Sequence, residues 1–393
     1  MSILFASGID NGCPIIPGRG RVDVMDACGH YARWEQDFEL ARELGVQALR
    51  YGPAYHRSHV GPDRFDWDPC DEPMRRLRDL GIETIATLCR FGVPSWLGGF
   101  QDPAFPVLFA EYARAFARRY PWVRYFTPVD QIAHTARRSA LDGAWNEGDR
   151  SDAAFVRATV NMCLAHELAV DAIMAERPDA IIVQVERVEP VVAPEGEGAS
   201  ARPCDRGEWE RAIPHLALDL VLGRESPAVL RCAAEHGVAT NDLRFLREPR
   251  AEGRRWLGVA LPASHGASGG ASGARRAIAE HHRRYHLPVL IAEAGHAGDG
   301  AGEALCALWD DVQALRAAGV DLRGLGWFPL TDRALHEAEQ DARHGAAPRV
   351  LAGLADRERG VTGVGEIFEE LVWGWAQPAR EGEGAPEAVE RAG

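Results

Sequence analysis

The sequence predicts an α/β protein folded as a single (β/α)8 TIM barrel. Short runs rich in β-branched residues alternate with longer amphipathic stretches along the chain, which is the pattern of parallel strands joined by helices. The alternation occurs eight times, which is the number that closes a barrel. A doubly wound sheet, the alternative, would need a GxGxxG turn opening its first helix, and residues 5–20 contain glycines without that pattern.

The elements can be placed in order from their hydrophobic patterns. ETIATL at 83–88 and IIVQVE at 181–186 are typical of buried strands, and the spacing of Leu40, Ala41 and Leu44 favours a helix. The predicted strands are 3–9, 46–51, 83–88, 124–129, 181–186, 255–261, 288–293 and 323–330. The predicted helices are 31–44, 69–80, 103–119, 152–175, a helical region with an insertion at 208–236, then 273–285, 302–318 and 364–375. We expect the barrel over 1–376 and a disordered acidic tail over 377–393.

Composition narrows the class of protein. The 393 residues carry 44 basic and 58 acidic side chains, so the net charge is 44 − 58 = −14, which argues against a nucleic-acid partner. Every basic residue is arginine, which excludes Schiff-base and phosphate-loop lysines. No apolar run approaches the roughly 20 residues of a membrane span, and the start is too short and polar for a signal peptide. Eight scattered cysteines without a CxxC pair indicate reduced thiols in a cytoplasmic protein.

Polar side chains follow almost every predicted strand. Barrel enzymes place their reacting groups at the carboxyl ends of the strands, so these residues are the candidates for a site that acts on a small molecule. A ring of them around one rim is harder to explain by helix capping than a single acid would be. They are Asp10, Arg50, Tyr51, Arg90, Asp130, Gln131, Glu186, His265, Glu293, His296 and Asp332.

Two stretches of the sequence are distinctive, 43–97 (ELGVQALRYGPAYHR…GVPSWL) and 102–145 (DPAFPVLFAEYARAFARRYPWVRYFTPVDQ…DGAW). In these stretches the chain resembles glycoside hydrolase family 1, the β-glucosidase family, and it looks closest to the short bacterial members. The resemblance is weaker at VQVER (183–187), PVLIAEAG (288–295) and GLGWFPLTD (324–332), and loose between 192 and 256. It implies a (β/α)8 barrel, in agreement with the strand count.

The resemblance also implies catalytic roles. The family retains anomeric configuration with two glutamates, an acid/base after strand four and a nucleophile at the end of strand seven. The nucleophile matches Glu293, whereas the acid/base position holds Gln131, after Asp130. An amide cannot donate a proton to a leaving group. Three interpretations stay open: an activated substrate that needs no acid, a glycosidase turned binding protein, or proton transfer by Asp130 or Glu186.

Further site residues follow from the same resemblance. Arg50 matches the arginine that holds the nucleophile carboxylate, and Arg90 stands where the family has a sugar-binding histidine. Arg90 would suit an anionic substrate group or could pair with Asp130, which replaces the family's asparagine. Trp327 is expected as the platform under the sugar, with Tyr51 and Glu186 as further substrate contacts. The family's Asn-Tyr-Tyr after strand six is absent, so glucose itself is doubtful as substrate.

Two other classes of function remain. Rim acids and histidines such as those at positions 10, 186, 265, 293 and 296 could bind a divalent cation, as in sugar isomerases, although no tight ligand spacing such as HExxH is present. A repurposed barrel that binds a sugar-like ligand in a biosynthetic pathway is the other alternative. The preferred hypothesis is a cytoplasmic retaining glycosidase or transglycosidase without metal or cofactor. Its partner is a small glycoside, with no nucleic acid and no membrane, and a homo-oligomer is allowed.

Overall fold

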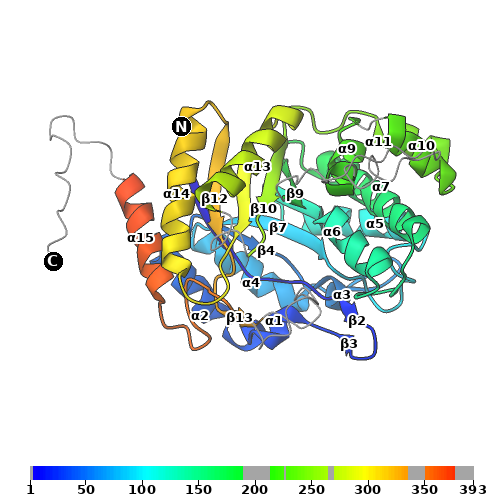
Figure 1. Ribbon diagram of the computed structural model, residues 1–393. Helices are drawn as coiled ribbons and strands as arrows, with labels where there is room; N and C mark the ends of the chain where they lie inside the picture. The colour runs from blue at the N-terminus through cyan, green and yellow to red at the C-terminus, as the bar shows by residue number, and fades with distance from the viewer. Residues whose placement is uncertain (1–2, 189–212, 225–226, 264–269, 335–349, 377–393) are drawn as a thin grey trace, which may run out of the picture.

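The computed structural model describes residues 3–188, 213–224, 227–263, 270–334 and 350–376, and within them the fold is a closed parallel barrel. The eight barrel strands run around the ring in chain order, and the last pairs with the first. Figure 1 shows helices packed around these strands. The predicted (β/α)8 barrel is therefore confirmed. The barrel strands are β1 (Leu4–Gly8), β4 (Ala48–Tyr51), β7 (Glu83–Arg90), β8 (Tyr125–Asp130), β9 (Ile181–Arg187), β10 (Arg255–Ala260), β11 (Val289–Ala294) and β12 (Leu322–Trp327).

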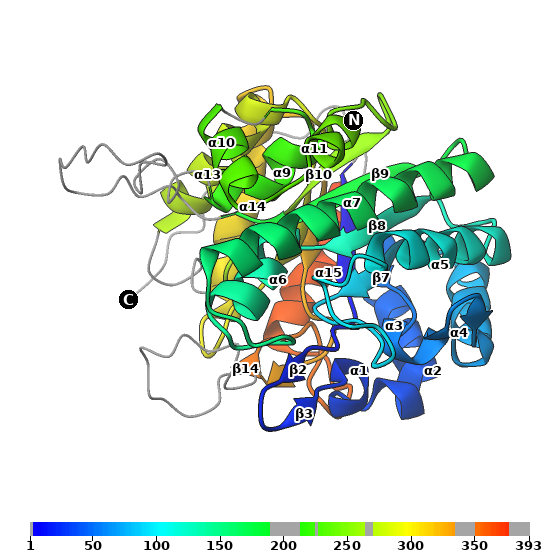
Figure 2. The same cartoon turned by 90° about the vertical axis from the view of Figure 1, so that its right-hand side faces the viewer.

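Helices surround the barrel, and the long helix α7 lies beside α5 across one side of the molecule (Figure 2). None of the described helices is both long and apolar enough to cross a membrane. The main helices are α2 (His30–Glu43), α4 (Asp68–Asp79), α5 (Phe105–Arg119), α7 (Asp152–Glu176), α9 (Leu216–Val221), α10 (Pro227–Glu235), α11 (Thr240–Leu246), α13 (Gly270–Tyr285), α14 (Ala301–Ala317) and α15 (Gly363–Ala376).

The sequence predictions match these elements to within a few residues. The described part of 208–236 contains α9 and α10, as expected for a helical region, while the predicted tail at 377–393 lies outside the described residues. Short pieces at the rim were not predicted, because two to five residues carry too little periodicity. They are the hairpins β2–β3 (Ile15–Ile16, Gly20–Arg21), β5–β6 (His59–Gly61, Arg64–Phe65) and β13–β14 (Arg333–Ala334, Val350–Leu351), and helices α1 (Val24–Ala27), α3 (Tyr55–Ser58) and α6 (Ile132–Ala136).

Alternating side chains on each strand face the barrel interior or the helices. Ala48 of β4 and Val183 and Val185 of β9 belong to the interior cluster, which consists of alanines and branched aliphatic residues. By the two-residue period, Arg50 and Arg187 point the same way as these residues, toward the mouth of the barrel. The residues between them, such as Leu49, pack against the helix layer.

Strand β11 departs from regular pairing shortly before its end. Val259 of β10 pairs with Ile291, but the next residue, Ala260, pairs with Glu293, so β11 has one extra residue. The pairing with β12 skips the same stretch. Such a bulge bends a strand and redirects the following side chain, and here that side chain is Glu293.

Candidate active site at the barrel mouth

Glu293 is the centre of a dense polar cluster at the mouth. Its side chain is only 12% exposed. Oε1 accepts hydrogen bonds from Arg50 and, at 2.6 Å, from Nη1 of Arg90. Oε2 accepts from Nη2 of Arg90 at 3.2 Å and from the amide nitrogen of Gln131 at 3.0 Å. Four donors from three strand ends therefore fix this carboxylate.

The two arginines also bind two other buried carboxylates. Arg90 contacts Asp130 and, through Nε, Oδ1 of Asp10 at 2.8 Å. Arg50 Nη2 lies 3.0 Å from Asp130 Oδ2. The expected Arg90–Asp130 pair and the contact of Arg50 with Glu293 are thus both present, and Asp10 joins them. Buried charges need this kind of mutual pairing, since each one loses its hydration.

The cluster sets the ionisation of its carboxyl groups. Burial favours neutral acids, but the guanidiniums of Arg90 and Arg50 outweigh it at Glu293 and lower the pKa of that carboxyl below its ordinary value. Burial likewise opposes ionisation of Asp10, yet Arg90 and Arg333 lower its pKa to about 2. At Asp130 burial wins over Arg50 and Arg90, and its pKa is raised. Glu293 and Asp10 are therefore both ionised at neutral pH, and Glu293 is the more exposed of the two.

Gln131 is held in an unusual backbone conformation between β8 and α6. Its φ is +49°, in the left-handed region that non-glycine residues seldom adopt. Its N–H donates to Val185 O at 3.0 Å, and helix α6 begins at the following residue. Non-glycine residues in this region cluster at functional sites. The conformation turns the amide side chain toward Glu293.

Glu186 lies behind Gln131 and does not reach Glu293. Its carboxyl group accepts the N–H groups of Ile132 at 3.0 Å and Ala133 at 3.2 Å, at the start of α6. Burial raises the pKa of Glu186 to about 8 against the opposing effect of these two N–H groups. The side chain thus anchors the turn that carries Gln131, and its predicted contact with substrate stays a prediction.

Two predicted contacts are not brought to the mouth. Tyr51 points to the helix layer, where its ring packs edge-on against Phe38 of α2 with centroids 5.3 Å apart. Trp327 is 1% exposed and donates its indole N–H to Ala352 O at 2.9 Å. Both residues stand on the outward-facing positions of their strands. Two other aromatic rings lie beside the Arg90 guanidinium carbon, Phe91 with its centroid at 4.2 Å and Phe328 at 5.3 Å.

Of the other rim residues, Arg333 contacts the cluster around Glu293 and His296 does not. Arg333, which the sequence did not single out, reaches within 3.5 Å of Asp10 Oδ2 from β13; no local pattern marks it. His296 Nε2 contacts Asp299 O at 2.7 Å and is not part of the Glu293 cluster. His265 lies outside the described residues. Within those residues, no group of three or more His, Cys, Asp or Glu side chains is arranged to hold a metal ion.

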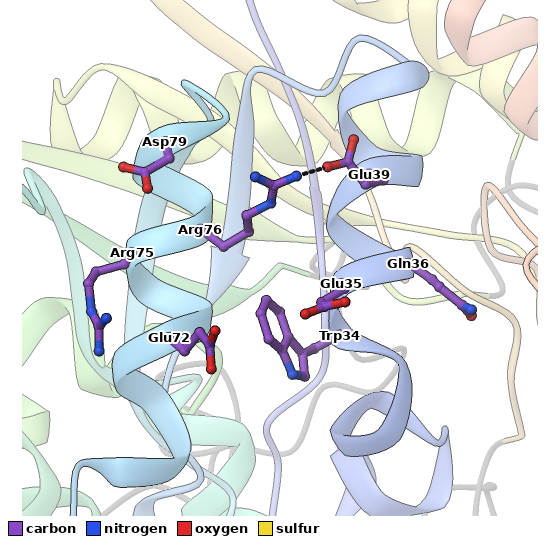
Figure 3. A pocket seen from close by; sticks show the side chains of 8 residues that line it. All are labelled: Trp34, Glu35, Gln36, Glu39, Glu72, Arg75, Arg76 and Asp79. Atoms are coloured by element: carbon purple, nitrogen blue, oxygen red, sulfur yellow. Dashed lines mark hydrogen bonds and ion pairs between the residues drawn. The ribbon is translucent and has the colours of Figure 1, made fainter.

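A separate groove lies outside the barrel, between α2 and α4 (Figure 3). Glu39 pairs there with Arg76 across the two helices. None of the mouth residues lines the groove, so it is distinct from the Glu293 cluster. Its lining includes Trp34, Glu35, Glu39, Glu72, Arg76 and Asp79.

Comparison with known proteins finds similarity to glycosyl hydrolases in the first half of the chain. Residues 18–202 match the model of glycosyl hydrolase family 1. A β-glucosidase of Agrobacterium sp. is 31% identical over 165 residues, covering 39% of this chain and 35% of that protein. β-Glucosidase A of Thermotoga maritima is 29% identical over 152 residues, covering 37% of this chain and 34% of that one. The aligned part thus spans about a third of the length of these curated relatives.

The likeness in structure covers nearly the whole chain. The β-glucosidase of Thermotoga maritima in complex with deoxynojirimycin superposes with a TM-score of 0.77 at 20% identity, covering 96% of this chain and 99% of that chain. At this identity the likeness concerns the fold. This chain and that β-glucosidase therefore share the (β/α)8 architecture. The match to glycosyl hydrolase family 1 over 18–202 contains Arg50, Arg90 and Gln131 but not Glu293.

Proposed function

We propose that the protein is a retaining glycosidase or transglycosidase that acts on an activated or anionic glycoside through nucleophile Glu293, without a carboxylic acid/base. The observation that carries this proposal is the contact of 3.0 Å between the Gln131 amide nitrogen and Glu293 Oε2. It brings together the ends of the fourth and seventh barrel strands, where a retaining enzyme needs its two catalytic groups. One of the two is a carboxylate and the other an amide.

The geometry supports the first half of a double displacement. Arg50 and Arg90 keep Glu293 ionised, so an oxygen of Glu293 can attack the anomeric carbon as the bond to the leaving group breaks. The bonding electrons move to the leaving group, and Gln131 has no proton to supply. The leaving group must therefore be stable as an anion. In the second half, a water or an acceptor hydroxyl attacks the same carbon, Glu293 is released, and the proton passes to solvent.

Neither nearby acid fits the missing role well. Asp130 is fully buried and bound by both arginines, so a leaving group cannot reach it in this conformation. Glu186 is bound to backbone N–H groups behind Gln131. These contacts favour an enzyme that works without a proton donor over one that has recruited a new donor.

A binding protein that has lost catalysis is the second candidate. Both oxygens of Glu293 are occupied by donors from the protein, which weakens the carboxylate as a nucleophile. One relative at 24% identity is a rice protein described as a probable inactive β-glucosidase. If the protein is of this kind, calorimetry should detect binding of a sugar-like ligand, and no activated glycoside should be turned over.

The free thiols of the described cysteines support the expected cytoplasmic location.

Covalent labelling separates the two candidates. We expect dinitrophenyl 2-deoxy-2-fluoro glycosides, tested as a panel of sugars, to attach a fluoroglycosyl group to Glu293, identified by mass spectrometry of the peptide. Glu293→Gln should abolish labelling, whereas Glu43→Gln on the exposed end of α2 should leave it unchanged. If no member of the panel labels the protein, or if Glu293→Gln is still labelled, the glycosidase proposal is wrong.

A further inference from the structure

His134 lies at the mouth beside the residues that hold Glu293, and no step of the proposed reaction uses it. It belongs to α6, three positions after Gln131, so about one helical turn separates the two residues. Its ring meets the Phe91 ring edge-on, with centroids 5.9 Å apart. The Phe91 ring in turn lies 4.2 Å from the guanidinium carbon of Arg90, which binds Glu293. Two contacts thus connect His134 to the arginine on the nucleophile.

The ring of His134 is held in place by aromatic neighbours. Besides Phe91 it contacts Trp145, with centroids 5.4 Å apart and the ring planes at 84°. Phe91 and Trp145 are both buried and pack on each other at 5.0 Å. Asn146 donates its amide N–H to Phe91 O at 3.0 Å, which fixes the segment that carries Phe91. The imidazole therefore has a defined orientation in the protein without substrate.

The ring nitrogens of His134 are open to a ligand. The side chain is partly exposed, and within the described part of the chain neither nitrogen has a hydrogen-bond partner. The acids of the mouth are already bound by the protein. Arginines bind Asp10, Asp130 and Glu293, and backbone N–H groups bind Glu186. His134 differs from these acids because a water molecule or an acceptor hydroxyl can bind to it directly.

His134 is in its neutral form at neutral pH. Burial and, after it, the surrounding arginines hold the pKa of the imidazole well below its ordinary value of 6.5. These arginines are Arg187, Arg138, Arg90 and Arg137. A neutral imidazole has one nitrogen without a proton, which can accept one. The arginines make it a weak base, and a weak base is sufficient here, because a water molecule becomes strongly acidic as it bonds to the anomeric carbon.

We infer that His134 is the general base of the second half of the reaction. This inference rests on the proposed function and supplies the proton acceptor that the amide of Gln131 cannot be. A water molecule or an acceptor hydroxyl bonds through its oxygen to the anomeric carbon, and its proton passes to the unprotonated ring nitrogen of His134. The bond from that carbon to Glu293 breaks, and its electrons return to the Glu293 carboxylate. The imidazolium then gives the proton to solvent.

Reactivation of the labelled protein tests this role. Protein carrying a 2-deoxy-2-fluoro sugar on Glu293 is transferred to fresh buffer, and mass spectrometry follows the release of the sugar in water alone and with azide. Water needs a base in order to attack, whereas the azide anion has no proton to lose. We expect His134→Gln to slow release by water about a hundredfold or more and to leave release by azide unchanged. The matched control is His236→Gln, directly after α10, which should leave both rates unchanged.

The pH dependence of release gives a second measurement. Because His134 accepts a proton only when it is neutral, release by water should stay constant as pH falls to 6.5, the ordinary pKa of histidine, and should decrease only at more acidic pH. An increase in rate toward pH 8 would instead indicate Glu186, whose pKa is about 8, and would overturn the inference. This measurement uses the unsubstituted protein, so it does not depend on whether the variant folds.

The outcomes separate this inference from the proposed function. If the protein is labelled and His134→Gln releases the sugar in water as fast as the unsubstituted protein, the inference is overturned and the glycosidase stands. If His134→Gln slows release by water and by azide equally, the side chain acts only on the structure of the site, and the inference is likewise overturned. If no member of the panel labels the protein, the proposed function is wrong and this inference with it.

Discussion

The guanidinium of Arg90 binds both oxygens of Glu293, with Nη1–Oε1 at 2.6 Å and Nη2–Oε2 at 3.2 Å. The same side chain contacts Asp10 and Asp130. Arg90 and Arg50 together thus compensate the negative charges of three buried acids at the mouth. The stability of the barrel mouth and the ionisation of Glu293 depend on the same two groups.

Replacing Arg90 with methionine should destabilise the protein by about 3–5 kcal/mol, since it leaves buried carboxylates without their counter-charge. Urea unfolding measures the loss. Adding Asp10→Asn should recover part of it, because one unpaired charge is removed with its partner. Arg118→Met, which breaks a surface pair with Glu176, should cost at most about 1 kcal/mol. A double variant as unstable as the sum of its parts would contradict this account.

Replacing Gln131 with glutamate should restore a proton donor beside Glu293. We expect the rate for aryl glycosides with poor leaving groups to rise by about a hundredfold or more, while dinitrophenyl glycosides change little. The measurement is the dependence of kcat/KM on leaving-group pKa, which should be steep in the unsubstituted protein and shallow in Gln131→Glu. Gln36→Glu on α2 is the matched control. An equally steep dependence in both proteins would show that position 131 lacks access to the leaving group.

Asp10 should make the protein sensitive to acid in a defined range. Its folded-state pKa of about 2 lies below the ordinary value of 3.8, so its ionised form stabilises the folded state above pH 3.8 and this stability is lost as pH falls toward 2. The difference is worth about 2 kcal/mol. Urea midpoints between pH 6 and pH 2.5 should show Asp10→Asn and the unsubstituted protein converging at the acidic end. Parallel curves would count against an ionised Asp10.

Glu186 should act in the opposite direction. Its pKa is raised from 4.5 to about 8, so its protonated form stabilises the folded state below pH 4.5 and that contribution is lost as pH rises toward 8. The loss is at most about 1.4 kcal/mol per pH unit. Relative to the unsubstituted protein, Glu186→Gln should therefore become more stable as pH increases over this range. A constant difference in urea midpoint would mean that the N–H groups of α6 keep Glu186 ionised throughout.

Much of the architecture follows from the sequence, because buried parallel strands are rich in β-branched residues and the helices carry a clear apolar face. The pairing of Glu293 with Arg50 was also expected, from the resemblance to a family. The direction of the side chains at the strand ends could not be predicted from the sequence. Tyr51 and Trp327 were expected at the mouth, yet Tyr51 packs against Phe38 of α2 and the buried Trp327 donates its indole N–H to Ala352 O. Strand-end geometry depends on bulges and turns that composition does not encode.

Because of the extra residue in β11, the position of the Glu293 carboxylate depends on the length of the strand as well as on the residue type. Because Ala260 pairs with Glu293 only across that irregularity, removing Ala292 would make the strand regular, and the Glu293 side chain would lose the change of direction that the bulge gives it. Evolution at this edge should accept substitutions more readily than changes in length. If β11 were replaced by a strand with regular pairing, the barrel could still close, but the Glu293 side chain would be misdirected.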